Sequence, residues 1–322
     1  MIPWLLCGLG LLILLLAGDA LVRGAVNLSL RVGIPALIVS LTIVAFGTSA
    51  PELIISLSAL HEGKPDLALG NVVGSNTANV LLVLGLPAII SRMHTSQLDT
   101  KRSYLMMLAG SVLFIGLAFL GSFNWITGII LLAALAMTLG DQFFSARKHM
   151  ADAKLSCAEA EADEIADLEG ADPDMPWWKI IVFLALGLVG LPLGADLLVE
   201  NASIIARQFG VSDAVIGLTL VALGTSLPEL ATTVVAAMRK QADVAMGNVI
   251  GSNIFNLLAI IGVTSLFGEI PVDAEFLTFD LWVMLGASLI LAPFVLMGRD
   301  LGRRWGALLT FLYLLYVTMV LV

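Results

Sequence analysis

The chain is a succession of apolar segments, most of them long enough to cross a lipid bilayer. A transmembrane helix needs about 20 predominantly apolar residues. Of the 322 residues, 59% are hydrophobic and 13% are charged, whereas soluble domains carry about 25% charged residues. This excludes a water-soluble globular protein and predicts an all-α integral membrane protein. The segments predict ten transmembrane helices, near residues 3–31, 36–62, 66–90, 103–121, 124–144, 177–207, 212–238, 243–267, 276–298 and 304–322.

Basic residues are distributed unevenly between the two sides of these segments. If the first segment starts outside, the outward loops hold only Lys64 and Arg207, and most other basic residues fall in inward loops. This bias follows the positive-inside rule, so we expect a multi-pass protein of the cell inner (plasma) membrane with both termini outside. The formal net charge of -9 provides no basic surface for nucleic acid.

One hydrophilic stretch, residues 145–176, separates five apolar segments in residues 1–144 from five in residues 177–322. Its composition favours a solvated, flexible cytoplasmic linker. A regulatory cation sensor is the alternative, but the Asp-x-Asp-x-Asp-Gly pattern of an EF-hand loop is absent. The acidic residues of the linker are Asp152, Glu159, Glu161, Asp163, Glu164, Asp167, Glu169, Asp172 and Asp174.

The two halves are copies of one another, offset by 177 residues. The segment LTIVAFGTSAPEL (Leu41–Leu53) corresponds to LTLVALGTSLPEL (Leu218–Leu230), and GNVVGSNTAN (Gly70–Asn79) corresponds to GNVIGSNIFN (Gly247–Asn256). Shared polar residues at matching sites indicate a duplication rather than a chance likeness between apolar helices. Five segments separate each motif from its copy, and five is odd, so the sequence predicts two inverted five-helix repeats.

Inverted repeats are a common plan of secondary transporters, whose substrate site lies near the membrane midplane beside interrupted helices. Gly47 and Pro51 would interrupt the second helix, as Gly224 and Pro228 would the seventh. Proline removes a backbone donor and clashes with the preceding turn, so nearby carbonyls can turn away from the helix. We therefore expect exposed carbonyl oxygens at these two positions. The motifs Gly70-x-x-x-Gly74 and Gly247-x-x-x-Gly251 favour close helix packing instead.

Glu52 and Glu229 lie in the middle of otherwise apolar helices, where an ionised side chain needs a partner or a water-filled cavity. No lysine or arginine near the motifs can neutralise them, whereas one divalent ion would balance both. Calcium prefers six to eight oxygen ligands; imidazoles and thiolates are absent, so a zinc or copper site is not expected. Interhelical hydrogen bonding is the alternative role for the polar neighbours. These neighbours are Thr48, Ser49, Ser75, Asn79, Thr225, Ser226, Ser252 and Asn256.

Asp19 and Asp196 form a second duplicated acidic pair, in the first and sixth helices. Arg23 follows Asp19 by four residues and can pair with it, but Glu200 stands at the equivalent position of the second half. The unequal surroundings favour a structural or gating role; proton binding is the alternative.

The motifs GTSAPE and GTSLPE, with GNVVGSN and GNVIGSN, resemble the two alpha-repeats of the calcium/cation antiporter family (sodium/calcium exchanger superfamily), most of all its short prokaryotic members. The resemblance covers nearly the whole chain except the acidic linker. It implies ten helices, calcium transported against sodium, and four clustered cation sites. It also implies that Ala45 and Ala222 contribute backbone carbonyls. Some relatives have aspartate where Asn256 stands, so potassium co-transport is less expected here.

Together these observations predict a secondary-active antiporter that exchanges Ca²⁺ for Na⁺ by alternating access, with the first and sixth helices sliding across the bundle. A Ca²⁺/H⁺ antiporter, with Glu52 and Glu229 exchanging protons, is the main alternative. A cation channel with acidic rings is a further one. No cofactor and no enzymatic activity are expected, because no constellation of nucleophile, base and orienting group accompanies the paired acids.

Overall fold

The structure is a computed structural model that describes residues 2–155, 172–210 and 222–321. Nearly all of these residues are helical, which agrees with the predicted all-α class. In this described part, eight helices are long and apolar enough to cross a membrane. The predicted segment 212–238 lies partly outside the described residues, as do the linker acids Glu159, Glu161, Asp163, Glu164, Asp167 and Glu169.

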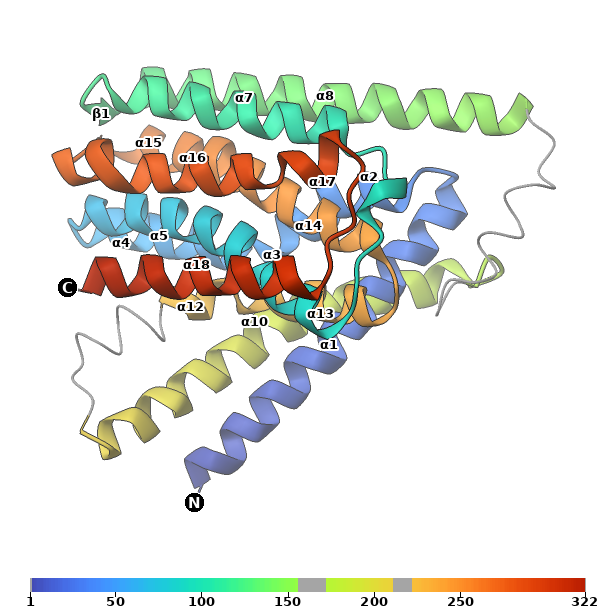
Figure 1. Cartoon of the computed structure of the whole chain (residues 1–322), viewed down its shortest axis with the longest axis horizontal. Helices are drawn as coiled ribbons and strands as arrows, with labels where there is room; N and C mark the ends of the chain where they lie inside the picture. Colours follow the sequence, from blue (N-terminus) through green and yellow to red (C-terminus); the bar gives the residue numbers. More distant parts are fainter. Residues whose placement is uncertain (1, 156–171, 211–221, 322) are drawn as a thin grey trace.

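The first half contains five long segments of helix before the linker, two of which change their winding along the way (Figure 1). Its elements are α1 (Ile2–Val32), α2 (Ala36–Val39), η1 (Ser40–Val44), α3 (Ala45–Thr48), α4 (Ala50–His61), α5 (Pro65–Ala78), η2 (Asn79–Val83), α6 (Gly85–Ile90), η3 (Thr95–Gln97), α7 (Lys101–Ala118), β1 (Ser122–Phe123) and α8 (Trp125–Leu155). The segments η1 and η2 are π-helical, and η3 is a 3₁₀ turn.

The described part of the second half likewise begins with one long helix and continues with a broken helix and a helix that contains a π-helical segment. Its π-helical segments are η5 and η6. The elements are α10 (Trp177–Gln208), α12 (Ala222–Thr225), α13 (Leu227–Met238), α14 (Ala242–Ile254), η5 (Phe255–Ile260), α15 (Ile261–Phe267), β2 (Ile270–Pro271), η6 (Phe276–Asp280), α16 (Leu281–Ile290), α17 (Ala292–Leu296) and α18 (Arg303–Leu321).

Helix α8 continues to Leu155, beyond the end predicted at residue 144. Residues 145–155 read SARKHMADAKL and contain neither glycine nor proline. Alanine, arginine, lysine, methionine and leucine all have high helix propensity, so the helix persists after the apolar run has ended. The first part of the predicted linker is therefore helical.

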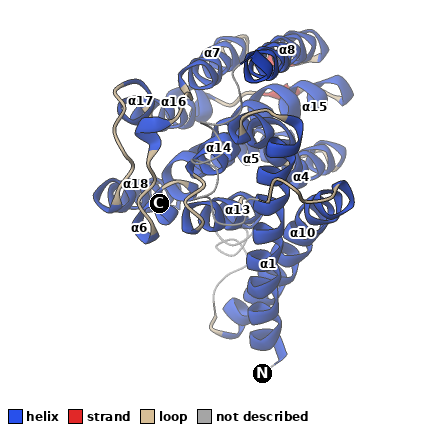
Figure 2. Ribbon diagram, turned by 90° about the vertical axis from the view of Figure 1, so that its right-hand side faces the viewer, coloured by secondary structure: helices blue, strands red, loops and turns tan. Residues whose placement is uncertain are grey.

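Helices α1 and α10 pack along each other and slant across the rest of the bundle, as Figures 1 and 2 show. Two glycines permit the close approach: a Cβ on Gly187 would lie 2.5 Å from the Leu21 Cβ, and one on Gly10 would lie 2.8 Å from the Leu198 backbone nitrogen. Small residues let membrane helices pack closely in this way. The slanted pair is thus held together by close contacts between α1 and α10.

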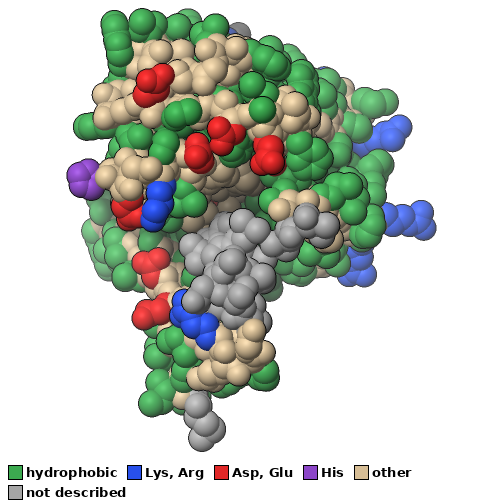
Figure 3. Space-filling view, turned by 90° about the vertical axis from the view of Figure 1, so that its left-hand side faces the viewer, with side chains coloured by type: hydrophobic (Ala, Val, Ile, Leu, Met, Phe, Trp, Pro, Cys, Tyr) green, Lys and Arg blue, Asp and Glu red, His purple; other side chains and the backbone are tan. Residues whose placement is uncertain are grey.

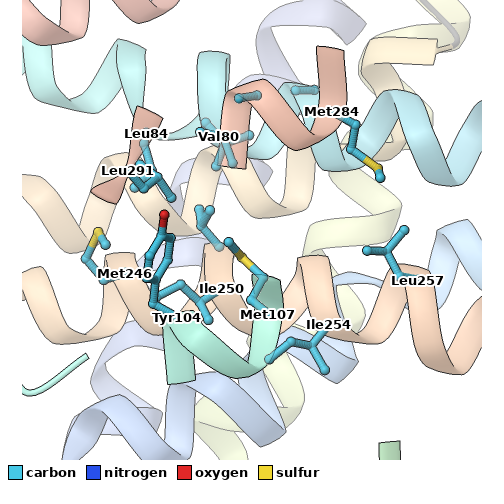
Figure 4. Close-up of a cluster of buried hydrophobic side chains, with 14 of the residues drawn as sticks. Val80, Leu84, Tyr104, Met107, Met246, Ile250, Ile254, Leu257, Met284 and Leu291 are labelled. Carbon is cyan, nitrogen blue, oxygen red and sulfur yellow. The ribbon is translucent and has the colours of Figure 1, made fainter. Parts of the chain in front are cut away.

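The remaining helices surround α14 and η5, which are almost completely buried. Figure 4 shows this core, with Met107 of α7 beside Ile250 of α14 and Met284 of α16 farther away within the same cluster. The buried Tyr104 hydroxyl donates to the Ser288 carbonyl oxygen over 3.0 Å, which satisfies its polar end inside the core. The bundle core therefore fixes α14 and η5 in place.

Glycines also bring α14 against the second transmembrane segment. A Cβ on Gly251 would lie 2.5 Å from the Leu41 carbonyl oxygen, and one on Gly247 would lie 2.8 Å from the Leu37 carbonyl oxygen. The close packing predicted for Gly247 and Gly251 is confirmed, but not that for Gly70 and Gly74, where a Cβ would meet nothing closer than the Phe276 ring at 3.7 Å. The packing at Gly247 and Gly251 brings the first repeat's broken helix against α14 of the second.

Candidate cation site

Each repeat has a helix that breaks immediately before its glutamate. Helix α3 ends at Thr48, and Ser49 has φ -87° and ψ 3°; in the second repeat Ser226 has φ -87° and ψ 4° between α12 and α13. Pro51 and Pro228 stand in the first turn of the helices that follow, where the missing N–H costs nothing. Both predicted interruptions are present and have nearly the same geometry.

Glu52 and Glu229 lie in the first turns of α4 and α13. Their exposed fractions are 1% and 0%, and they are close enough to interact electrostatically. The Ser49 hydroxyl donates to Glu229 Oε1 over 3.2 Å and so joins the two repeats. Glu229 Oε2 and both carboxylate oxygens of Glu52 have no hydrogen-bond partner. A buried carboxylate without partners is strongly unfavourable unless a cation or a proton neutralises it.

The predicted hydroxyl ligands come together around these carboxylates. The Thr48 hydroxyl donates to Asn248 Oδ1 over 3.2 Å and lies 3.5 Å from the Ser252 hydroxyl. The Ser226 hydroxyl is buried and has no partner. Ser75 and Ser252 are also buried.

The predicted amides Asn79 and Asn256 are completely buried where the helix widens into a π-helical turn. Such single π-turns are frequent at functional sites. Asn79 Nδ2 donates to Asn253 Oδ1 over 3.1 Å, while Asn79 Oδ1 and both amide atoms of Asn256 have no partner. Buried polar groups are normally hydrogen-bonded, so these atoms indicate room for a ligand or water.

The predicted carbonyl ligands sit just before the breaks. The Ala45 carbonyl oxygen accepts the Ser49 N–H over 3.0 Å and lies 3.3 Å from the Thr48 hydroxyl. This oxygen therefore keeps its helical hydrogen bond, although its second lone pair can still coordinate an ion. Ala222 begins α12 and adjoins residues outside the described part.

The charge around the carboxylates is not balanced by protein groups. Within residues 2–155, 172–210 and 222–321, no lysine or arginine forms a salt bridge with Glu52 or Glu229. The same residues contain no group of three or more His, Cys, Asp and Glu side chains that could hold a metal. The site therefore offers two carboxylates and neutral oxygens, a donor set for hard cations that exchange readily.

Asp19 and Asp196, the second duplicated acidic pair, have different surroundings. The predicted pair forms, with Arg23 Nε 2.9 Å from Asp19 Oδ2. Arg239, at the end of α13, also pairs with Asp19. Sequence spacing does not predict this contact, because the two residues are 220 positions apart.

Asp196 is exposed and lines a cavity of about 90 Å³ between α10, α4 and α13. Thr225, one of the predicted ligands, lines the same cavity, which is large enough to hold several waters. A larger cavity of about 470 Å³, beside Ser96 and Lys101, lies among surface loops and includes none of the predicted ligands.

Comparison with known proteins identifies the family. The family described as sodium/calcium exchanger protein matches residues 2–143 and 179–322. The inner membrane protein YrbG of Escherichia coli K12 is 36% identical and aligns over 96% of this chain and 94% of its own. The sodium/calcium exchanger MaX1 of Methanosarcina acetivorans is 33% identical, over 98% and 97% of the two chains.

A solved structure of the sodium-calcium exchanger NCX_Mj, soaked with Na⁺ and Sr²⁺, has the same fold. It superposes with a TM-score of 0.82 at 31% identity and covers 99% of this chain and 98% of that chain. The resemblance to short prokaryotic exchangers is thereby confirmed. The chain belongs to the sodium/calcium exchanger protein family and is a multi-pass membrane cation antiporter.

Proposed function

We propose that this antiporter exchanges Ca²⁺ for Na⁺ by alternating access. The ions are its substrates, and one site, shared by the two repeats, binds them in turn. Its ligands are the carboxylates of Glu52 and Glu229, the hydroxyl or carbonyl oxygens of Thr48, Ser49, Ser75, Thr225, Ser226 and Ser252, the amides of Asn79 and Asn256, and the backbone carbonyls of Ala45 and Ala222.

The observation that carries this proposal is the pair of buried glutamates with unpartnered oxygens. Glu52 has no hydrogen-bond partner on either carboxylate oxygen, and Glu229 has one free oxygen. One Ca²⁺ neutralises both carboxylates, and so do several Na⁺ ions that use the same oxygens. The empty site would leave two uncompensated buried charges, which is costly. The protein therefore changes conformation when loaded, which couples the two ion fluxes.

We propose that ten transmembrane helices form two inverted repeats, residues 1–144 and 177–322, joined by an acidic cytoplasmic linker. Equivalent breaks at Ser49 and Ser226 support the duplication. The distribution of basic residues supports termini outside the membrane. The name of the relative YrbG supports a location in the inner membrane.

The slanted pair α1 and α10 are the elements that move. These helices pack mainly on each other, whereas α14 and η5 are held inside the core. Motion of the pair can open the site alternately to either side. The cavity beside Asp196 supports access from the α10 side in the conformation described here.

A Ca²⁺/H⁺ antiporter is the alternative, because protons could also neutralise Glu52 and Glu229. Reconstituted vesicles separate the two functions. We expect uptake of radioactive calcium to require an outward sodium gradient and to persist when an ionophore collapses the pH gradient. Uptake that follows the pH gradient without sodium would favour the proton antiporter, and flux without any counter-ion would indicate a channel.

A further inference from the structure

Two asparagines next to the site occupy equivalent positions in the two repeats. Asn71 is in α5 and Asn248 is in α14, and both are the first asparagine of the GN motif. Asn71 Nδ2 donates to the Glu52 backbone carbonyl over 3.2 Å, and Asn248 Nδ2 donates to the Glu229 backbone carbonyl over 3.3 Å. Each amide also donates to a hydroxyl one turn further along, Ser56 and Thr233 respectively.

These contacts fix which way each amide points. A backbone carbonyl can only accept a hydrogen bond, so the NH₂ group of Asn248 must face Glu229 and its oxygen must face the other way. That oxygen lies 3.2 Å from the Thr48 hydroxyl. In the other repeat, Asn71 Oδ1 lies 3.4 Å from the Thr225 hydroxyl. Because an amide oxygen only accepts, each threonine must be the donor.

A threonine hydroxyl has one proton and two lone pairs. When Asn248 accepts the proton of Thr48, the lone pairs point away from the amide and remain available to a cation. The Ala45 carbonyl, 3.3 Å from the same hydroxyl, is the competing acceptor. With the proton on the Asn248 side, the lone pair of the Ala45 oxygen that the Ser49 N–H does not use is also left available to an ion. The asparagine thus prepares two oxygens at once.

We propose that Asn71 and Asn248 are positioning residues of the cation site, each orienting the threonine hydroxyl of the opposite repeat so that its lone pairs face the ion. This inference rests on the proposed function, because it assumes that calcium binds beside Glu52 and Glu229. It adds that each asparagine connects the two repeats: its NH₂ group binds the backbone of the glutamate in its own repeat, and its oxygen binds the threonine ligand of the other repeat.

Two other asparagines on the same helices direct their NH₂ groups into the apolar core. Asn76 Nδ2 points to the Met284 sulfur at 3.8 Å, and Asn253 Nδ2 points to the Met107 sulfur at 3.7 Å. Figure 4 shows both methionines among the buried apolar side chains of the core. The Asn76 amide connects helices within the core and touches no predicted ligand among its described hydrogen bonds, whereas Asn71 and Asn248 contact threonine ligands of the opposite repeat. Asn253 does both, because its Oδ1 accepts from the predicted ligand Asn79.

A double-mutant cycle on purified full-length protein tests the proposal. The variants are Asn248→Ala, Thr48→Val and their combination, and the readout is the calcium concentration for half-maximal uptake into vesicles. One lost hydrogen bond corresponds to about a tenfold change. We expect Asn248→Ala to raise this concentration about tenfold in the wild type, but only about twofold when Thr48 is already valine, because the oriented hydroxyl is then absent.

Thr233→Val is the matched control. It removes the other partner of the same amide and touches no predicted ligand, so we expect a change of less than about twofold. The proposal would be overturned if Asn248→Ala raised the half-saturating calcium concentration by the same factor with and without the Thr48 hydroxyl. The asparagine would then act only through its hydrogen bonds to α13. If Asn248→Ala does not fold, the cycle of Asn71→Ala with Thr225→Val makes the same prediction at the less buried amide.

The rise in melting temperature caused by calcium provides a second readout that does not require transport. We expect Asn248→Ala to need about ten times more calcium for half of the maximal rise. If the wild-type protein neither transports calcium nor is stabilised by it, the proposed function fails and this inference with it. If the wild type binds calcium but the cycle is additive, this inference alone fails.

Discussion

Asp19 on α1 and Asp196 on α10 occupy equivalent positions of the two repeats, yet their surroundings differ. Asp19 pairs with Arg23 on its own helix and with Arg239 at the end of α13. Asp196 is exposed and lines the cavity that reaches Thr225. With the 177-residue offset, the positions equivalent to the two arginines hold acidic residues, Glu200 and Glu62.

The two ends of the bundle show the same contrast. At the acidic end, where α4 turns into α5 (residues 62–64), acidic side chains gather on the surface in Figure 3. The exposed acids there are Glu62, Asp66, Glu269, Asp273 and Glu275. At the paired end, where α13 is followed by α14 (residues 239–241), Asp19 of α1 forms a salt bridge with Arg239. Duplication therefore preserved the site, whereas the charges at the two ends diverged.

The largest expected effect tests the part in which the halves are alike. Glu52→Gln and Glu229→Gln should each lower sodium-driven calcium uptake by about a hundredfold or more, because each removes one of two charges that balance the ion. Uptake into vesicles, normalised to the amount of folded protein, provides the measurement. Glu62→Gln, at an exposed carboxylate, serves as the control. Near-normal uptake by either buried variant would show that the two halves do not share one site.

The next effect tests the pairing of Asp19. Arg239→Gln removes the link between α1 and α13 and should favour movement of α1 by about 1–2 kcal/mol, or roughly tenfold, since the pair is partly buried. Ala231 is buried in α13 against Gly18 of α1. In a cysteine-free background, an Ala231→Cys probe should therefore react about ten times faster with a thiol reagent after Arg239→Gln.

Arg23→Gln is the matched control for this experiment, because Arg23 lies on the same helix as Asp19 and the salt bridge between them stays within α1. We expect it to change the reaction of the Ala231→Cys probe by less than about threefold, as exposed pairs contribute little. Equal acceleration by both arginine variants would mean that the salt bridge across the helices does not hold α1 in place.

A smaller effect concerns Asp196. A negative charge in a water-accessible cavity raises the local cation concentration, and salt screens this attraction. Asp196→Asn should therefore raise the half-saturating calcium concentration about threefold at low ionic strength and less at high ionic strength. Asp273→Asn, exposed at the same end but outside the cavity, is the control. A salt-independent change would indicate that Asp196 acts structurally rather than by attraction.

The smallest effect concerns the loops at the paired end. Slight burial raises the pKa of Asp300, but hydrogen bonds from Ser96 and the neighbouring His94 outweigh it and lower that pKa to about 2. Arg92 also pairs with this carboxylate. Because the folded pKa lies below the ordinary value of 3.8, the stabilisation is complete above about pH 4 and is lost as the pH falls toward 2.

Melting temperatures of the detergent-purified protein check this sign. Wild type should melt a few degrees above Asp300→Asn at pH 6, and the difference should shrink steadily between pH 4 and pH 2.5. A difference that stays constant over this range would show that the ionised carboxylate of Asp300 does not stabilise the loop.

Much of the site was predictable because each of its main features is local in sequence. The positions of Glu52 and Pro51, and of their copies Glu229 and Pro228, follow from motifs within single helices. The extension of α8 to Leu155 was not predicted, because the end of an apolar run indicates where a helix leaves the membrane rather than where it stops.

Asn71 and Asn248 were missed although a signal existed. Each is a polar residue at the same place of both apolar repeats, the criterion that singled out Asn79 and Asn256. Their role depends on contacts with Thr225 and Thr48, far away in the sequence. The salt bridge between Asp19 and Arg239 has no such signal in the sequence. The position equivalent to Arg239 in the first repeat holds Glu62, so the contact is not repeated.

The amino-acid sequence by itself determined the membrane class, the duplication, the broken helices and the two buried glutamates, because hydrophobicity, proline and internal similarity act over short distances along the chain. Only the tertiary structure decided which oxygens remain without a hydrogen-bond partner, which asparagine binds which threonine, and which aspartate forms salt bridges with arginine. Those outcomes depend on how helices from opposite repeats approach one another, and the spacing of residues along one segment does not identify the partners that this approach brings together.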